Sequence, residues 1–170
     1  MNDLNWYGAD QALVQGYVYV VEDDASIRDS IKRTLISLNY RVLAFSDPAK
    51  FLDVVTDKVS PCVLLLDMRL PNCTGLHVQA SLQERGVDLP IVFMSGESTV
   101  LQAVKAMEAG AAKFLVKPVT RAALIDAVTQ GLQQDLQRRQ KQEARQRVDK
   151  LMVRLTPRER EVLSWVRKGL

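Results

Sequence analysis

Five short apolar segments constrain the fold of this chain more than any other feature. They are four to six residues long, and each is followed by a stretch with the spacing or the capping signals of a helix. The segments are residues 17–21, 41–45, 62–67, 91–95 and 113–116. We predict a β-strand at each. Residues 62–66 are apolar throughout, as expected of a strand that is covered on both faces of its sheet.

The stretches between these segments carry helix signals. Isoleucine and leucine side chains share one face of a helix over residues 27–35, and the Asp-Pro pair at 47–48 is typical of a helix start. Further helices are predicted at 75–85, at 99–109 and from about 120 onward, with Ser98 as a cap and Gly86 and Gly110 as stops. The strict alternation of strands and helices along the chain predicts an α/β fold with helices on both faces of a five-stranded parallel sheet. We expect the flavodoxin-like strand order 2-1-3-4-5, followed by a long helical linker and the start of an all-α domain.

Composition excludes several classes of protein. With 47% hydrophobic and 25% charged residues, the chain can bury a core and is not disordered. Its longest apolar run is too short to span a membrane, and its first ten residues lack the basic and apolar parts of a signal peptide. Two cysteines form no disulfide framework, and the single histidine, His77, excludes His-rich metal sites. We therefore expect a cytoplasmic protein without a membrane partner.

The N-terminal part of the chain is acidic, and the C-terminal part is basic. Residues 1–120 carry 14 acidic and 11 basic residues, whereas residues 121–170 carry 6 acidic and 12 basic residues. The asymmetry suggests two functions. We expect an N-terminal tail over 1–15, a first domain over 16–132, a helical linker over 133–153 and the first helix of an incomplete second domain over 154–170.

The basic linker has two interpretations. Asp135–Arg139 and Glu143–Arg147 are acid-before-base pairs four residues apart, which support an exposed helix. A solvated helix face is therefore the favoured interpretation. Contact with DNA phosphates is the alternative.

Polar side chains stand where four of the predicted strands end. Glu22 and Asp23 follow the first strand, Asp67 ends the third, Ser95 ends the fourth and Lys117 follows the fifth. Because the carboxyl ends of parallel strands meet at one edge, these groups should converge. Clustered carboxylates favour Mg²⁺, which prefers oxygen ligands. With a cation present, Asp67 could attack a phosphoryl group and hold it as an acyl phosphate. Lys117 and Ser95 would then contact the negatively charged phosphoryl oxygens.

Four motifs resemble the receiver domains of response regulators from two-component signalling. They are VYVVEDDASIR, LLLDMRLPNCTG, IVFMSG and KFLVKP, and the resemblance covers about residues 16–130. In the second motif, Pro71 and Gly75 follow Asp67 by four and eight residues. The resemblance implies that a sensor histidine kinase phosphorylates Asp67.

The resemblance also implies a metal site for Mg²⁺ or Mn²⁺. Asp23 and Asp67 would bind the cation directly, Glu22 would act through water, and the Arg69 carbonyl would be a further ligand. The family more often has Asp where this chain has Glu22. The longer side chain still supplies oxygens, so the function is not affected.

The same resemblance implies a switch and a homodimer. Ser95 and Lys117 would contact the phosphoryl group, and Phe114 would be the switch aromatic; Ser95 replaces a common Thr but keeps the hydroxyl. Related receivers pair through the helix predicted at 99–109. On it we expect Val100, Ala103 and Met107 to face the sheet. The interface residues that we predict are Leu101, Val104, Glu108 and Lys113.

Residues 155–163, LTPREREVL, resemble the opening of a LuxR-type helix-turn-helix domain of the FixJ/NarL-like kind. Thr156 and Glu159 have the spacing of a capping box, with Pro157 at the first helical position. The resemblance implies that the complete C-terminal domain binds promoter DNA. The chain is thus interpreted as a phosphorylation-controlled transcription regulator, not an enzyme.

Two alternatives remain. A haloacid-dehalogenase-type phosphatase also uses an Asp nucleophile, but it needs a second Asp where this chain has Arg69. The receiver could instead act as a protein-binding module through its long helix. Of the remaining reactive residues, we expect His77 on the surface, Cys62 in the core and Cys73 in a loop without special function.

Overall fold

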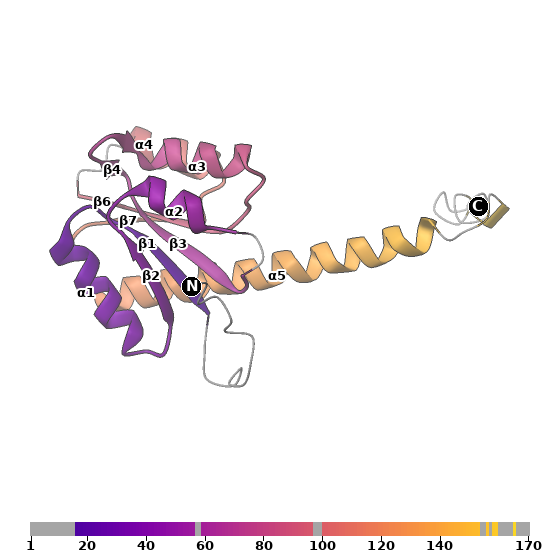
Figure 1. Ribbon diagram of the computed structural model, residues 1–170, viewed down its shortest axis with the longest axis horizontal. Helices are drawn as coiled ribbons and strands as arrows, with labels where there is room; N and C mark the ends of the chain where they lie inside the picture. The colour runs from indigo at the N-terminus through magenta and orange to yellow at the C-terminus, as the bar shows by residue number, and fades with distance from the viewer. Residues whose placement is uncertain are drawn as a thin grey trace. The chain divides into compact units, whose positions relative to one another are not determined.

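The computed structural model describes residues 16–56, 59–96 and 100–153, together with Thr156, Arg158, Glu159 and Trp165. Within this part of the chain, a five-stranded parallel sheet has the order β2-β1-β3-β6-β7 (Figure 1). The strands are β1 (Tyr17–Val21), β2 (Arg41–Phe45), β3 (Cys62–Asp67), β6 (Ile91–Ser95) and β7 (Lys113–Val116). Their bounds and their flavodoxin-like order agree with the prediction.

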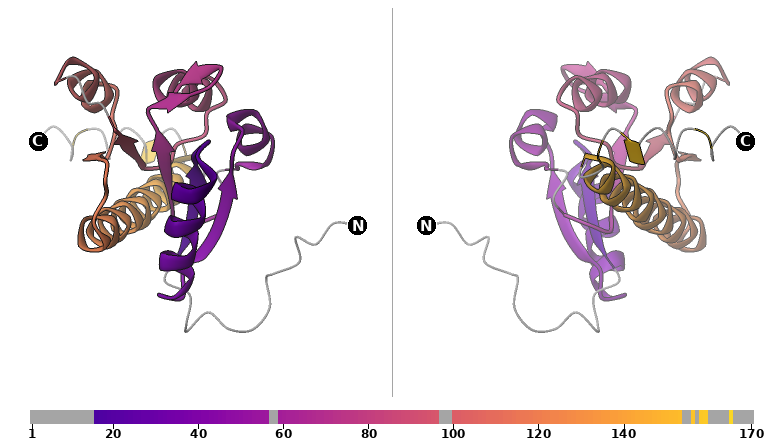
Figure 2. Two further views of the ribbon diagram at one scale, coloured as in Figure 1. Left: turned by 90° about the vertical axis from the view of Figure 1, so that its left-hand side faces the viewer. Right: turned by 90° about the vertical axis from the view of Figure 1, so that its right-hand side faces the viewer.

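Helices cover both faces of this sheet (Figure 2). The helices are α1 (Ala25–Ile36), α2 (Pro48–Val54), α3 (Gly75–Glu84), α4 (Val100–Glu108) and α5 (Arg121–Val153). Alternate residues of each strand point to opposite faces. Val18 and Val20 of β1 therefore pack with α1 and α5, whereas Tyr19 and Val21 pack with α2, α3 and α4.

Local capping signals start and stop these helices as predicted. The Asp47 carboxylate accepts a hydrogen bond from the Ala49 amide at 2.9 Å, which starts α2. Gly86 and Gly110 follow α3 and α4 with positive φ angles of 68° and 90°, a backbone conformation that glycine adopts readily. The predicted cap Ser98 lies outside the described residues.

A small antiparallel pair, β4 (Arg69–Leu70) and β5 (Cys73–Thr74), was not predicted. It connects the end of β3 to the start of α3. Two-residue strands are too short to show a periodic pattern in the sequence. The pair matters for the site because it begins two residues after Asp67.

The prediction that Met107 of α4 faces the sheet is wrong. Ala106 is fully buried and Ala103 is half-buried, whereas Met107 is 49% exposed. Apolar residues occur on several sides of this helix, so its spacing was compatible with two orientations. The small Ala106 side chain is the one that packs in the core. Of the other predicted residues, Leu101 and Val104 are exposed, and the side chain of Val100 is not described.

Helix α5 is continuous through the predicted linker, but its burial differs from the prediction at Asp135. This carboxylate is completely buried and accepts hydrogen bonds from the Ser60 hydroxyl at 2.9 Å and from the Cys62 amide at 3.0 Å. The prediction that Asp135 lies on an exposed helix face is therefore wrong. The first compact unit ends at Asp135, and a second unit begins at Leu136.

The predicted capping box near the C-terminal end is present. The Glu159 carboxylate accepts from the Thr156 amide and hydroxyl, both at 2.8 Å, and the Glu159 amide donates to the Thr156 hydroxyl at 3.4 Å. Pro157 and most of the remaining predicted helix lie outside the described residues. Among the residues that the structure describes, no helix is both long and apolar enough to cross a membrane.

Candidate functional site

The candidate site lies at the carboxyl ends of four neighbouring strands. Parallel pairing aligns Val21 of β1 with Leu66 of β3, and Asp67 of β3 with Met94 of β6. The residues that end or follow these strands are therefore brought to one edge of the sheet. This alignment is the basis of the predicted convergence, which concerns Glu22, Asp23, Asp67, Ser95 and Lys117.

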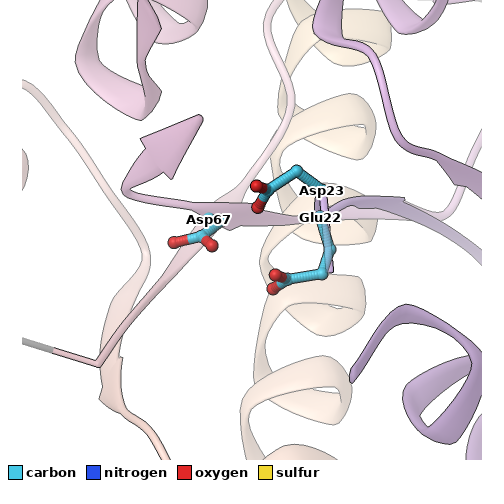
Figure 3. A group of neighbouring side chains, drawn as sticks. All are labelled: Glu22, Asp23 and Asp67. Atoms are coloured by element: carbon cyan, nitrogen blue, oxygen red, sulfur yellow. The ribbon is translucent and has the colours of Figure 1, made fainter. Parts of the chain in front are cut away.

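Three carboxylates form the centre of the site. Glu22, Asp23 and Asp67 each offer an oxygen that lies within 4.8 Å of the others (Figure 3). Glu22 is completely buried and Asp67 is only 6% exposed, whereas Asp23 is exposed to solvent. The group thus combines two buried carboxylates with one that is exposed to solvent.

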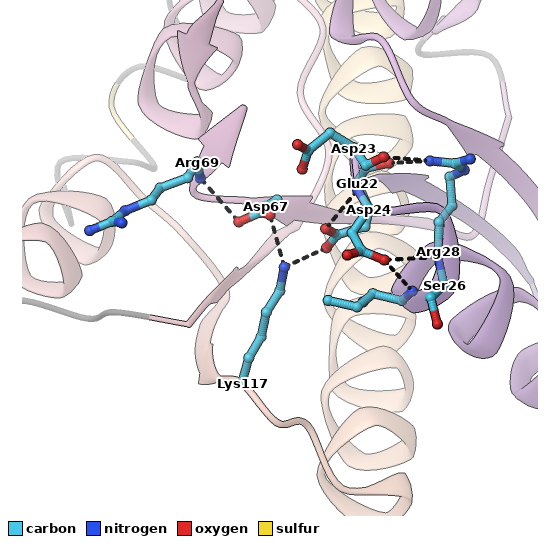
Figure 4. Close-up of polar contacts among 9 residues, drawn as sticks. Glu22, Asp23, Asp24, Ser26, Arg28, Asp67, Arg69 and Lys117 are labelled. Atoms are coloured by element: carbon cyan, nitrogen blue, oxygen red, sulfur yellow. Dashed lines mark hydrogen bonds and ion pairs between the residues drawn. The ribbon is translucent and has the colours of Figure 1, made fainter. Parts of the chain in front are cut away.

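Lys117 links two of these carboxylates. Its Nζ donates to Glu22 Oε2 at 2.6 Å and to Asp67 Oδ2 at 2.8 Å (Figure 4). The lysine follows β7, which is an edge strand on the other side of β3 from β1 and β2. One ammonium group thus offsets the charge of two buried acids.

Burial and charge shift the pKa values of this network. Burial raises the pKa of Glu22 to about 7; the Lys117 hydrogen bond opposes this rise, and the Asp67 charge adds to it. For Lys117, burial alone would lower the pKa, but hydrogen bonds to Asp67 and Glu22 and the charges of both acids outweigh it, so the pKa is raised. Lys117 is therefore a permanent cation at neutral pH, and Glu22 is the group that can exchange a proton there.

The main chain around Asp67 holds its carboxylate in place. The Arg69 amide donates to Asp67 Oδ1 at 3.0 Å (Figure 4). Gly75, the first residue of α3, lies so close to β3 that an added Cβ atom would stand 2.8 Å from the Asp67 carbonyl oxygen and 2.7 Å from Phe93. Only glycine allows α3 to begin at this distance from the strand, which explains the glycine eight residues after Asp67.

The donor set of the site fits a hard divalent cation. All three side chains offer carboxylate oxygens, and Mg²⁺ is typically bound through one or two carboxylates with waters completing its shell. Asp23 and Asp67 are suited to direct binding, because Asp23 is exposed and the two groups face one another (Figure 3). Glu22 is deeper and is hydrogen-bonded to Lys117.

The remaining predicted site residues lie around this centre. Ser95 is completely buried at the end of β6, and Phe114 on β7 is half-buried against the core that faces α2, α3 and α4. Arg69 opens β4 with an exposed side chain, which extends away from Asp67 (Figure 4). The predicted metal contact of its carbonyl stays a prediction.

Two residues beside the site have contacts that were not predicted: Asp24 in the loop between β1 and α1, and Arg28 in the first turns of α1. Asp24 caps α1 by accepting hydrogen bonds from the Ser26 and Ile27 amides at 2.8 and 3.0 Å. Arg28 Nη1 donates to the carbonyl oxygens of Glu22 and Asp23 at 2.8 and 3.0 Å (Figure 4). The cap could have been recognised from the Asp that precedes the helix. The arginine contact had no signal in the spacing of residues.

No role in the site was predicted for the single histidine or for the two cysteines. His77 is exposed, and its Nδ1 accepts from the Thr74 amide at 3.2 Å at the start of α3. Cys62 is buried in β3, and Cys73 is half-buried in β5. Burial raises the pKa of the Cys73 thiol, and the nearby Asp47 charge adds to this effect, so the thiol is less reactive than an ordinary one.

Comparison with known proteins agrees with this geometry. The family profile described as "Response regulator receiver domain" matches residues 18–129. Nodulation protein W of Bradyrhizobium diazoefficiens is 36% identical over 163 residues, which cover 96% of this chain and 71% of the relative. Transcriptional regulatory protein TdiR of Thauera aromatica is 38% identical over 152 residues, covering 89% of this chain and 66% of the relative. The chain thus spans about two thirds of the length of these relatives.

Solved structures show the same similarity. The response regulator StyR is 37% identical with a TM-score of 0.80, and the match covers 91% of this chain and 77% of that one. Full-length FixJ from B. japonicum is 30% identical with a TM-score of 0.68, and the match covers 92% of this chain and 77% of that one.

Proposed function

The chain belongs to the response regulator receiver domain family, and from this premise we propose that it is switched by Mg²⁺-dependent phosphorylation of Asp67. One observation carries the proposal. Asp67 ends a strand that is buried along its whole length, beside two further carboxylates, and Lys117 donates to it at 2.8 Å. This arrangement combines a nucleophile, an oxygen-rich cation site and a fixed positive charge.

In the proposed reaction, a carboxylate oxygen of Asp67 forms a bond to the phosphorus atom of a phosphodonor. The bond between phosphorus and the donor breaks, and its electron pair leaves with the donor: an imidazole nitrogen for a sensor histidine kinase, an acetate oxygen for acetyl phosphate. A bound Mg²⁺ would supply positive charge to the oxygens of the transferring group.

The other residues act on the charge and the position of this group. The Lys117 ammonium, already beside Asp67, exchanges its contact with the carboxylate for one with a phosphoryl oxygen. The Arg69 amide keeps Asp67 oriented through its bond to Oδ1. Ser95 supplies a hydroxyl at the end of the neighbouring strand, and its movement toward the phosphoryl group would let Phe114 turn inward. The protein is thus an acceptor of phosphoryl groups and not a turnover enzyme.

Intact-mass spectrometry tests the assignment. Acetyl phosphate with Mg²⁺ should add one phosphoryl group to the parent chain and none to Asp67→Asn, and EDTA should block the reaction. Asp53→Asn is the matched control, since Asp53 is exposed on α2 and should leave the reaction unchanged. If Asp67→Asn still gains the mass of a phosphoryl group, another residue is the acceptor.

The proposed output is control of transcription. Relatives named as transcriptional regulatory proteins, TdiR and FixJ, are 38% and 35% identical to this chain. The capping box of Thr156 and Glu159 supports a helix that opens a C-terminal DNA-binding domain of the LuxR type. We assign the domains as before: receiver over 16–132, linker over 133–153 and the start of the DNA-binding domain over 154–170.

Phosphorylation is proposed to act through dimerisation of the receiver. Leu101, Val104 and Met107 expose apolar side chains on α4, and Val116 does so on the adjacent strand β7. Glu108 of α4 is exposed, and Lys113 of β7 forms an ion pair with Asp126 at the margin of this surface. Exposed apolar groups bordered by charges are typical of an interface that forms conditionally.

Light scattering with beryllofluoride, a phosphoryl mimic, tests this interface. The mimic should shift the parent protein from monomer toward dimer. Val104→Asp should remain a monomer, because a charge in a desolvated contact is costly. Val54→Asp is the control: Val54 on α2 is 52% exposed, close to the 45% of Val104, but lies on a different helix. If Val104→Asp dimerises like the parent, the interface lies elsewhere, and α5 is the next candidate.

A further inference from the structure

The loop that carries Glu22 and Asp23 connects β1 to α1 in three residues. The first helical backbone bond of α1 joins the Arg28 amide to the Asp24 carbonyl. The carbonyl groups of Glu22 and Asp23 precede that bond, so α1 does not supply them with amide partners. Donors for carbonyl groups at such a junction must come from side chains or from water.

Arg28 supplies those donors. Its Nη1 atom contacts the Glu22 carbonyl oxygen at 2.8 Å and the Asp23 carbonyl oxygen at 3.0 Å (Figure 4). An Nη atom carries two hydrogens, so one nitrogen can serve both carbonyls, and the guanidinium group does not lose its charge in proteins. Arg28 is half-buried one turn into α1, which limits the directions that its side chain can take.

These contacts go to the main chain and not to the carboxylates. The two carbonyls define the orientation of the peptide planes on either side of Asp23, and with them the directions in which the side chains of Glu22 and Asp23 leave the chain. The carboxylate of Asp23, which is exposed, is not occupied by these bonds. Arg28 therefore orients a ligand without competing for it.

We propose that Arg28 is a positioning residue for the divalent-cation site, holding the Glu22–Asp23 main chain so that both carboxylates are set for binding before the cation arrives. This inference rests on the proposed function, which places the cation among Glu22, Asp23 and Asp67. Preorganisation lowers the cost of binding, and residues that orient metal ligands typically affect metal affinity 10- to 100-fold.

Mn²⁺ binding to the full chain, measured without a phosphodonor by the electron paramagnetic resonance signal of free Mn²⁺, tests the proposal. Arg28→Met keeps the apolar stem but removes both the donors and the charge, and it should weaken Mn²⁺ binding by roughly 10- to 100-fold. Arg28→Lys keeps the charge on a shorter stem without the planar fork, and it should weaken binding at least threefold. The matched control is Arg33→Met on the same helix. Arg33 is exposed, and its recorded hydrogen bond is to the Asp29 carbonyl of its own helix.

A second readout separates positioning from loss of structure. In metal-free protein, hydrogen exchange should become faster in a peptide covering residues 20–26 of Arg28→Met, and it should be unchanged over residues 62–68. At saturating Mg²⁺, phosphorylation of Arg28→Met by acetyl phosphate should recover to within about threefold of the parent, since the chemistry at Asp67 is intact.

The outcomes are distinguishable. If the parent binds no Mn²⁺ and Asp67 takes no phosphoryl group, the proposed function fails, and the role of Arg28 fails with it. If the parent binds Mn²⁺ and Arg28→Met binds it equally well, only the role of Arg28 is wrong. If Arg33→Met loses as much affinity as Arg28→Met, the loss is not specific to the contacts of Arg28 with the Glu22 and Asp23 carbonyls, and the proposal is likewise overturned.

Discussion

Substitution of Lys117 by methionine should destabilise the receiver in a way that depends on pH. Methionine has a similar length to the lysine stem but lacks the ammonium group that contacts Glu22 and Asp67. Both acids are almost completely buried. Removing one partner from a buried ion pair typically costs about 3–5 kcal/mol of unfolding free energy. We expect a loss of this size at pH 8 in metal-free buffer.

The loss should be much smaller at pH 5.5, because Glu22 can then bind a proton. In the folded parent, burial raises the pKa of Glu22 to about 7, compared with 4.5 for an ordinary Glu, and removing Lys117 takes away a contact that lowers it. The folded state therefore holds more protons than the unfolded state from about pH 4.5 upward to this raised pKa. Stability consequently falls as the pH rises through that interval, and the interval extends above pH 7 in the variant.

Urea unfolding at pH 5.5 and pH 8.0 in the presence of EDTA measures both effects. Lys113→Met is the control: its ion pair with Asp126 is on the surface, and the pKa of Asp126 is lowered by the Lys113 hydrogen bond, so any pH dependence falls below about 3.8. Glu22→Gln combined with Lys117→Met should regain most of the loss at pH 8. Mg²⁺ at about 100 times its dissociation constant should add about 2.7 kcal/mol to the stability of any variant that still binds it. Equal losses for Lys117→Met at the two pH values would contradict the reasoning.

Two further substitutions should affect stability through contacts described above. Gly75→Ala should lower the free energy of unfolding by about 1–3 kcal/mol and slow phosphorylation, because its Cβ would stand 2.8 Å from the Asp67 carbonyl oxygen. Gly96→Ala is the control: its Cβ would have no neighbour within 4 Å, so the urea midpoint should not change. Asp135→Leu should lower the free energy of unfolding by about 1–3 kcal/mol, because it removes the acceptor of the buried Cys62 amide; the half-buried Ser60 hydroxyl loses the same acceptor. Asp149→Leu on the exposed part of α5 should cost little in the same assay.

The strands and the centre of the site could be predicted from the sequence because each rests on a local signal. Residues 62–66 are apolar without interruption, and this pattern is typical of a strand covered on both sides. Once the order of parallel strands is known, the residues after each strand must lie at one edge. The sequence therefore predicts that Glu22, Asp67 and Lys117 lie together, although Glu22 and Lys117 are 95 residues apart.

Burial could not be predicted where two alternatives satisfy the same pattern. Helix α4 has apolar residues on several sides, and only packing against the sheet selects Ala106 over Met107. Helix spacing identifies the residues that share a face, but it does not identify the face that is buried when more than one is apolar.

Contacts between a side chain and a distant main-chain group could not be predicted either. Aspartate within a polar stretch of helix normally faces solvent. The partners of Asp135 are nevertheless the Ser60 hydroxyl and the Cys62 amide, more than 70 residues earlier in the chain. Arg28 is near its partners in sequence, but whether an arginine binds carbonyl oxygens, carboxylates or water depends on the turn between β1 and α1. A binary pattern of polar and apolar residues contains no information on such geometry.

Strand β3 brings these observations together, because a carboxylate accepts a main-chain amide at each of its ends. Asp135 accepts from the amide of Cys62, its first residue, and Asp67, its last, accepts from the amide of Arg69. The amides at the ends of a strand can lack partners within the sheet, and acidic side chains are effective acceptors for them. At one end the carboxylate is completely buried and has a structural function. At the other end the carboxylate is adjacent to the exposed Asp23 and to Lys117. This difference in surroundings is the reason why we propose Asp67, and not Asp135, as the acceptor of the phosphoryl group.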